Sequence, residues 1–155
     1  MKKTLLVCCL LLLLTSIQLL AVETEPNDVR GDADKLNLNS SNTGAIGVPG
    51  DVDWWKVTTT SDGKLDITLA VSNGLYCYFQ LYDNDATTLL VSSNTQGTAG
   101  ISKDGLAPGT YYIYIYAYFA GQLPAYTVSN AFTAAPVLND IEPNDVYTQA
   151  NTLLP

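Results

Sequence analysis

KLDITLAV, residues 64–71, decides the fold class, because a large apolar side chain occupies every second position of it. Leu65, Ile67, Leu69 and Val71 share one face of the segment, and the residues between them share the other. This period of two residues is typical of a β-strand that buries one face and exposes the other. The segment therefore predicts a strand at the surface of a hydrophobic core.

Shorter runs of the same kind follow and precede this segment. We predict strands over Asp53–Thr60, Leu75–Tyr82, Leu89–Ser93, Tyr111–Phe119 and Tyr126–Asn130. Residues that favour turns separate them, and one or two turns of helix are expected within 29–38. Short strands with frequent turns indicate an all-β sandwich or barrel. By their shared parity, seven residues are expected in its core: Leu65, Ile67, Leu69, Phe79, Leu81, Ile113 and Ile115.

The N-terminus has the pattern of a secretory signal. Lys2 and Lys3 precede the apolar run Leu5–Leu14, and Ala21 offers a small residue for cleavage. The run is too short to cross a bilayer comfortably. We predict a signal peptide at residues 1–21 and a secreted, extracellular product; an uncleaved N-terminal anchor is the alternative.

Charge and composition exclude several functions. The chain has 7 basic and 15 acidic residues and a net charge of −8; without Lys2 and Lys3 five basic residues remain, for a net charge of −10. Such a chain has no basic patch for nucleic acid or for an anionic membrane. It contains no histidine, which excludes histidine-based triads and zinc sites. Cys77 is the one cysteine after the signal, and we expect a buried thiol. We predict that the chain is not an enzyme.

A short motif occurs twice. Glu25-Pro26-Asn27-Asp28-Val29 returns 117 residues later at 142–146, and Ala33 and Leu36 have matching residues at the same offset. The offset is about the length of one small β domain. We therefore expect a complete module at residues 22–132, a linker at 133–139, and the start of an incomplete second repeat at 140–155.

Four motifs in order resemble one family. They are EPND (25–28), GDVDWW (50–55), LYD (81–83) and LAPGTYY (106–112). Together they resemble the bacterial pre-peptidase C-terminal domain. The resemblance implies a jelly-roll-like antiparallel β-sandwich of about eight strands, carried as a non-catalytic accessory module by secreted hydrolases, often peptidases.

The same resemblance implies a calcium site. The collagen-binding domains of bacterial collagenases are similar and hold calcium on a Glu-x-Glu-x-Asn-Asp segment with two further aspartates. Here the corresponding residues are Glu23, Glu25, Asn27, Asp28, Asp51 and Asp53. One residue separates the last two where those relatives have two, so Asp51 is the better match. The alternative is a solvated acidic linker whose Asn27-Asp28 pair caps a short helix.

Tyrosines follow the outward parity of two predicted strands. They are Tyr76, Tyr78, Tyr82, Tyr112, Tyr114, Tyr116 and Tyr118. If both strands share a sheet, these side chains form a broad aromatic face that suits docking. Strand propensity alone, or burial against a neighbouring domain, also accounts for them. Trp54 and Trp55 point to opposite faces, so one of the two is expected in the core.

These features predict an accessory module of a secreted hydrolase or peptidase, stabilised by Ca²⁺, that binds an insoluble protein or polysaccharide. Catalytic or repeated domains of a larger protein are further expected partners. The alternative function is a structural spacer in a secreted or surface protein with several such domains, which the repeated motif favours.

Overall fold

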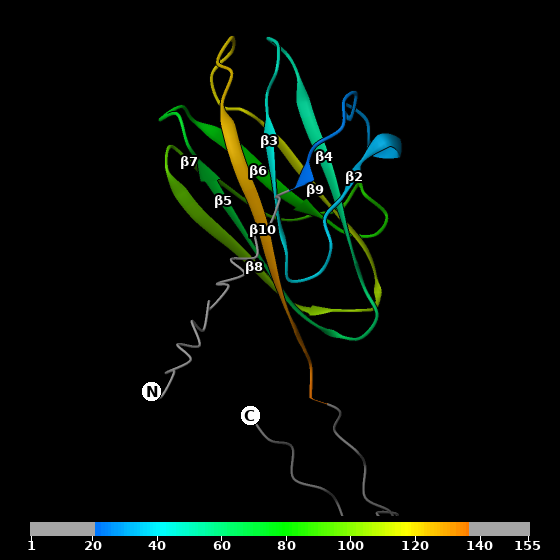
Figure 1. Ribbon diagram of the computed structural model, residues 1–155. Coiled ribbons are helices and arrows are strands. Elements are labelled where there is room, and N and C mark those ends of the chain that lie inside the picture. The colour runs from blue at the N-terminus through cyan, green and yellow to red at the C-terminus, as the bar shows by residue number, and fades with distance from the viewer. Residues whose placement is uncertain (1–20, 137–155) are drawn as a thin grey trace, which may run out of the picture.

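The computed structural model describes residues 21–136, which form two β-sheets packed face to face (Figure 1). The first sheet has the order β1-β3-β10-β5-β8: β1 Ala21–Val22, β3 Ser41–Ala45, β10 Ala125–Ala134, β5 Gly63–Val71 and β8 Thr98–Leu106. The second has the order β2-β4-β9-β6-β7: β2 Asp34–Lys35, β4 Val52–Thr59, β9 Gly109–Ala117, β6 Cys77–Tyr82 and β7 Leu89–Thr95. The predicted all-β sandwich is confirmed, with ten strands, two of them only two residues long.

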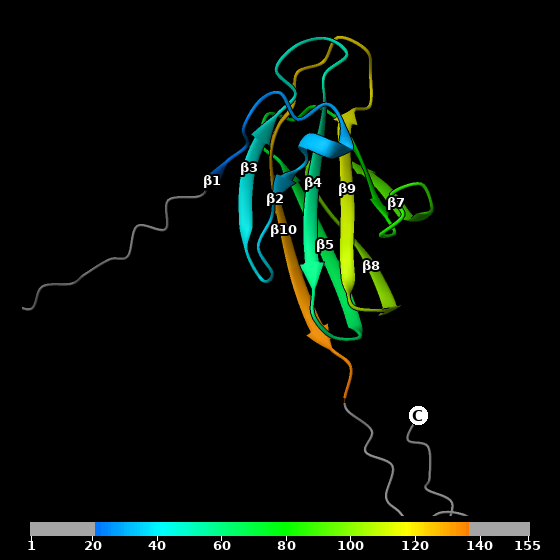
Figure 2. The same cartoon turned by 90° about the vertical axis from the view of Figure 1, so that its right-hand side faces the viewer.

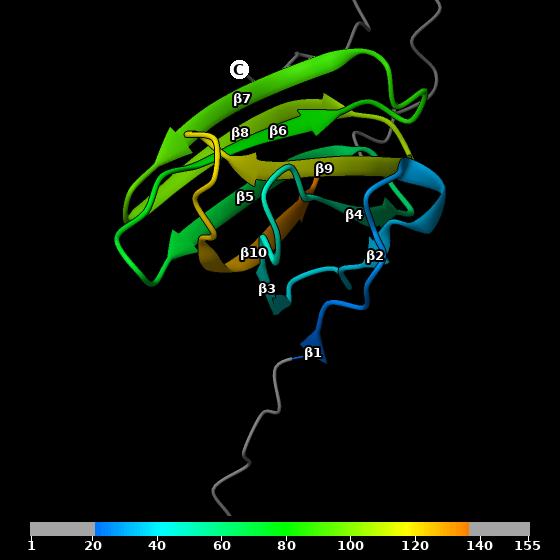
Figure 3. The ribbon, with the colours of Figure 1, turned by 90° about the horizontal axis from the view of Figure 1, so that it is seen from above.

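The strand pairs are antiparallel except at the N-terminus. There β1 runs parallel to β3 and β2 runs parallel to β4, so the first described residues add one short strand to each sheet. Figure 2 shows these four strands on one side of the sandwich. We call residues 21–36 the clasp and residues 37–134 the body. Seen from above, the clasp lies along the side of the two layers (Figure 3).

The core lies between the sheets and contains the residues expected from alternation. All seven predicted core residues are fully buried. Trp55 joins them, whereas Trp54 points outward from the same strand. Cys77 is buried as expected, and burial raises the pKa of its thiol to about 12. The thiol of Cys77 is therefore un-ionised at neutral pH.

Among the strands of five or more residues, the sequence pattern missed β3 and β8 and gave β7 and β10 too short. β3 buries Asn42 and Gly44 rather than large apolar residues, and β8 buries just Ile101 and Leu106, so neither alternates visibly. β10 continues to Ala134, and its last two residues pair with β5 although the sequence analysis assigned them to a linker. Of the one or two turns of helix expected within 29–38, the structure has a single 3₁₀ turn at Arg30–Asp32, which leads into β2, whose backbone pairs with the edge of β4.

Several expectations lie largely outside the described residues: the signal peptide, most of the linker and the second repeat. The described part begins at Ala21, which already pairs with Asn42. Within residues 21–136 no helix has both the length and the apolar character needed to cross a bilayer.

A substitution in β5 tests the core directly. Ile67→Ala should lower the free energy of unfolding by about 2–5 kcal/mol, because Ile67 is fully buried and its removal leaves a cavity. Urea unfolding measures the change. Thr68→Ala, on the outward side of the same strand, should change stability by no more than about 0.5 kcal/mol. Equal effects of the two substitutions would contradict the arrangement.

Candidate functional site

The clasp is held to the body by its backbone. Glu23 donates its N–H to the carbonyl of Thr43 at 3.0 Å, and Trp54 donates to the carbonyl of Asn27 at 3.2 Å. Leu36 donates to the carbonyl of Lys56 at 3.0 Å. These contacts are made to both sheets. They place the acidic residues of the clasp beside the first residues of β4, at one end of the core.

Asp53 lies at that end with its carboxyl group turned inward. It shares the inward parity of β4 with Trp55 and Val57 and has no exposed surface. Its Oδ2 accepts a hydrogen bond from the Tyr126 hydroxyl at 2.5 Å. The same hydroxyl accepts from Trp55 Nε1 at 2.9 Å and lies 3.1 Å from Glu23 Oε2. A hydroxyl carries one proton, so Tyr126 can donate to one of these two carboxylates at a time.

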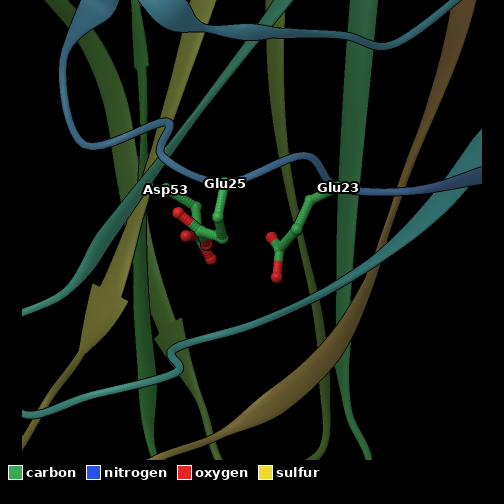
Figure 4. A group of neighbouring side chains, drawn as sticks. All are labelled: Glu23, Glu25 and Asp53. Carbon is green, nitrogen blue, oxygen red and sulfur yellow. The ribbon is translucent and has the colours of Figure 1, made fainter.

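Three carboxyl groups meet at this point (Figure 4). Glu23, Glu25 and Asp53 each offer an oxygen, and these oxygens all lie within 4.8 Å of one another. Two like charges at that separation repel by about 1 kcal/mol in water and by more where water is excluded. Ionising all three carboxyl groups is therefore costly unless a cation neutralises them; without one, they tend to keep protons.

The pKa values of the carboxyl groups reflect this cost. Burial, followed by the charges of Glu23, Asp51 and Glu25, raises the pKa of Asp53 to about 8, although the hydrogen bond from Tyr126 opposes the shift. Burial also raises the pKa of Glu23 and of Glu25 above their usual range. The site thus holds protons to higher pH than separate carboxyl groups would. A cation has to displace these protons to bind, so its affinity should rise with pH.

Two buried oxygens among the described residues accept no hydrogen bond. They are Asp53 Oδ1 and Asn27 Oδ1. An unpaired buried polar atom is destabilising, so each needs a donor or a positive charge. Carboxylate and amide oxygens are the ligands of hard cations such as calcium, whereas zinc favours nitrogen and sulfur. The donor set therefore fits calcium.

The other predicted ligands lie around this group. Asp51 Oδ2 accepts the N–H of Gly47, and its charge raises the pKa of both Glu25 and Asp53. Asp28 Oδ1 accepts from Val52 at 3.4 Å. Asp53, the poorer match by spacing, is the one that lies with Glu23 and Glu25. Asp51 precedes β4 and turns toward the loop at Gly47 instead.

Three residues that shape the site were not predicted from the sequence. Tyr126 lies on the inward face of β10. The sequence offered a signal for its role, because the hydroxyl of a buried tyrosine needs a hydrogen-bond partner. Asp34 Oδ2 accepts from Thr24 at 2.6 Å and from Asn27 Nδ2 at 3.4 Å, which fixes the bend of the clasp. At Gly44 a Cβ would overlap Glu23 Oε2 and the Tyr126 ring, so glycine there lets the clasp and β10 approach.

The predicted tyrosines lie together on the outer face of the second sheet. β9 pairs with β6, so Tyr116 lies beside Tyr78 with ring centroids 5.2 Å apart and planes at 29°. Trp54 extends the row, 4.7 Å from the Tyr114 ring. At the other end Tyr76 and Tyr118 meet at 5.9 Å, and Phe119 packs against both. We call the seven predicted tyrosines with Trp54 and Phe119 the aromatic face.

The aromatic face adjoins the acidic site. A hollow of about 370 Å³ is lined by Asp51, Tyr116, Gln122 and neighbouring loop residues. On the opposite border Arg30 of the clasp lies 5.9 Å from the Tyr112 ring centroid and donates to the carbonyl of Asp85 at 2.9 Å. The clasp therefore touches the aromatic face at Tyr112.

Fold and site together define a β-sandwich module with an oxygen-lined acidic site closed by its N-terminal segment. Neither a protein-family model nor a curated protein matches the sequence. Among solved structures, the pre-peptidase C-terminal domain of a collagenase from Bacillus anthracis is similar, at 22% identity and a TM-score of 0.52, over 63% of this chain and 93% of that one. The expected resemblance is thus confirmed at the level of the fold.

Two further solved structures are similar. A periplasmic inhibitor of g-type lysozyme from Aeromonas hydrophila has 10% identity and a TM-score of 0.50, over 65% of this chain and 97% of that one. The Yersinia pseudotuberculosis-derived mitogen has 15% identity and a TM-score of 0.48, over 73% and 97%. The collagenase domain and the lysozyme inhibitor are different proteins that share this fold, so function has to be argued from the site.

The raised pKa of Asp53 predicts how stability depends on pH without divalent cations. Folded Asp53 keeps its proton up to about pH 8, whereas an unfolded aspartate loses it near pH 4. The stability that the proton provides is complete below pH 4 and is lost as the pH rises toward 8. Asp53→Asn should flatten this decline, as measured by urea unfolding in chelator at pH 5 and pH 8.

The control for that measurement is Asp62→Asn, an exposed site with the same change of charge. This variant should decline with pH as the parent does. A parent protein whose stability in chelator is equal at pH 5 and pH 8 would show that Asp53 is ionised throughout.

Proposed function

We propose that the chain is a non-catalytic accessory module of an exported protein, that it holds one calcium ion in the acidic site, and that its aromatic face binds an insoluble protein or polysaccharide. The observation that carries the proposal is the buried carboxyl group of Asp53 beside Glu23 and Glu25, with one oxygen unpaired among the described residues. A divalent cation turns the repulsion of this group into attraction.

The proposed calcium ligands are Glu23, Glu25 and Asp53, with Asn27, Asp28 and Asp51 as the surrounding oxygen donors. Calcium takes 6–8 oxygen ligands, so a set of this size suits it. The ion would join the clasp, which supplies four of these residues, to β4 and the loop before it. Its role is therefore structural: it fastens the N-terminal segment to the sandwich.

The aromatic face supports the binding role. Its rings form a continuous row, and Tyr118 and Phe119 at one end are about half exposed. Tyrosine and tryptophan supply large contact areas at low cost in side-chain entropy, and they are enriched where proteins bind partners. A structural spacer remains the second candidate function, because the EPNDV motif recurs at 142–146 as an array of modules would require.

Thermal unfolding of residues 22–155 tests the calcium ion. At a hundredfold excess over its dissociation constant, calcium should stabilise the fold by about 2.7 kcal/mol relative to chelator, which raises the midpoint on the order of 10 °C. Asp53→Asn should abolish most of this shift and Asp62→Asn should keep it. An unchanged midpoint together with no heat of calcium binding would return residues 23–28 to the role of a solvated linker.

Pull-down on insoluble collagen, chitin and cellulose tests the aromatic face. Tyr114→Ala/Tyr116→Ala should weaken whatever binding the parent shows at least tenfold, since it removes two adjacent rings from the centre of the row. Thr68→Ala/Thr127→Ala, on the outer face of the other sheet, is the matched control and should bind like the parent. Retained binding by the tyrosine variant excludes this face as the contact surface.

A further inference from the structure

The clasp contacts the body through a small set of buried residues. Asn27, Ala33 and Leu36 are buried, whereas the 3₁₀ turn at Arg30–Asp32 is exposed. The other attachments are backbone hydrogen bonds, the two parallel pairings with β3 and β4, and side-chain hydrogen bonds such as those made by Glu23, Asp28 and Arg30. Residues 21–36 therefore dock as a separable strip along the edges of both sheets, and sheet edges readily accept an added segment.

The sequence of residues 140–153 repeats the residues that the clasp buries against the body. It is identical to residues 23–36 at seven of the fourteen positions: 25–29, 33 and 36. These include all three buried positions. Asp140 keeps the acidic group of Glu23, and Asn151 keeps an oxygen acceptor in place of Asp34. The five remaining differences, at 24, 30–32 and 35, all fall on residues that are exposed in the first copy.

The body of the same chain is out of reach for this second segment. To replace the clasp, Asp140 would have to lie where Glu23 lies, beside Gly44, which is level with Tyr126 on β10. The chain leaves β10 at Ala134, eight residues or about 26 Å further along the strand (Figure 1). It would also have to cross about 10 Å to the far side of β3. Six residues from Ala134 to Asp140 span at most about 22 Å.

We propose that residues 140–153 are a second clasp and that their partner is the sandwich body of a second copy of this chain. In the exchanged state the segment takes the place of residues 23–36 along β3 and β4 of that copy. The copy's own clasp is tethered to its body and competes at high effective concentration. Exchange therefore becomes dominant when the tethered clasp is weakened, and it links copies head to tail.

The test uses residues 22–155 with one clasp disabled at a time. Leu36→Asp places a charge at a position that is 1% exposed and should release the first clasp. This variant should self-associate, with a molar mass by light scattering and a thermal midpoint that both rise with protein concentration. Leu36→Asp/Leu153→Asp, in which the second clasp is disabled as well, should stay monomeric with a lower midpoint. A Leu36→Asp chain that is monomeric or unfolded at every concentration overturns the exchange.

Added peptides separate this contact from other modes of association. A peptide of residues 137–155 should raise the midpoint of Leu36→Asp/Leu153→Asp by several degrees, as a peptide of residues 21–37 should, whereas the 137–155 peptide with Leu153→Asp should not. Rescue by residues 21–37 alone, or by neither peptide, contradicts the proposal. So does association of Leu36→Asp that survives Leu153→Asp, because another surface would then be responsible.

Replacement of residues 23–36 by the sequence of residues 140–153 provides a measurement that needs no disabled clasp. The chimera should fold with a midpoint within a few degrees of the parent, since the buried residues are unchanged. A chimera that does not fold shows that the two segments are not equivalent. These outcomes do not depend on ligand binding by the aromatic face, which the pull-down measures separately.

Discussion

Asp53 places a carboxyl group on the inward side of β4, in the position that alternation reserves for a core residue. A charge there without a partner would cost several kcal/mol. The surrounding structure meets this constraint in part. Tyr126 reaches across from the other sheet, oriented by Trp55, to donate one hydrogen bond. The second oxygen, Asp53 Oδ1, has no donor among the described residues, and a bound cation would supply its missing partner.

The clasp follows from the same constraint. Glu23 and Glu25 add carboxylates beside Asp53, which destabilises the site at neutral pH unless a cation binds. Gly44 and Asp34 are what allow the clasp to lie this close. An ion at this point would bind residues from the clasp and from β4 at once. The order of the first residues of the chain is thereby linked to the chemistry of one buried side chain, and through Arg30 and the hollow at Asp51 to the aromatic face.

Much of this arrangement could be predicted from sequence, for identifiable reasons. β5 buries one face along its whole length and β9 buries the centre of one face, so their alternation revealed the fold and the core. β3 and β8 bury small or few side chains and leave no such signal. Alternation alone placed Trp54 and Trp55 on opposite faces but could not say which side was the core. Tyr126 was missed because its partners are 73 and 103 residues away in the chain.

Hydrogen–deuterium exchange of residues 21–30 in the wild-type protein is the most direct measure of the central claim, that a cation in the acidic site fastens the clasp. With calcium, the amide of Glu23, which donates to Thr43, should exchange far more slowly than in chelator, while the amides of β5 should change little. Equal exchange of residues 21–30 in calcium and in chelator would contradict the account, because the clasp would then be held by the protein alone.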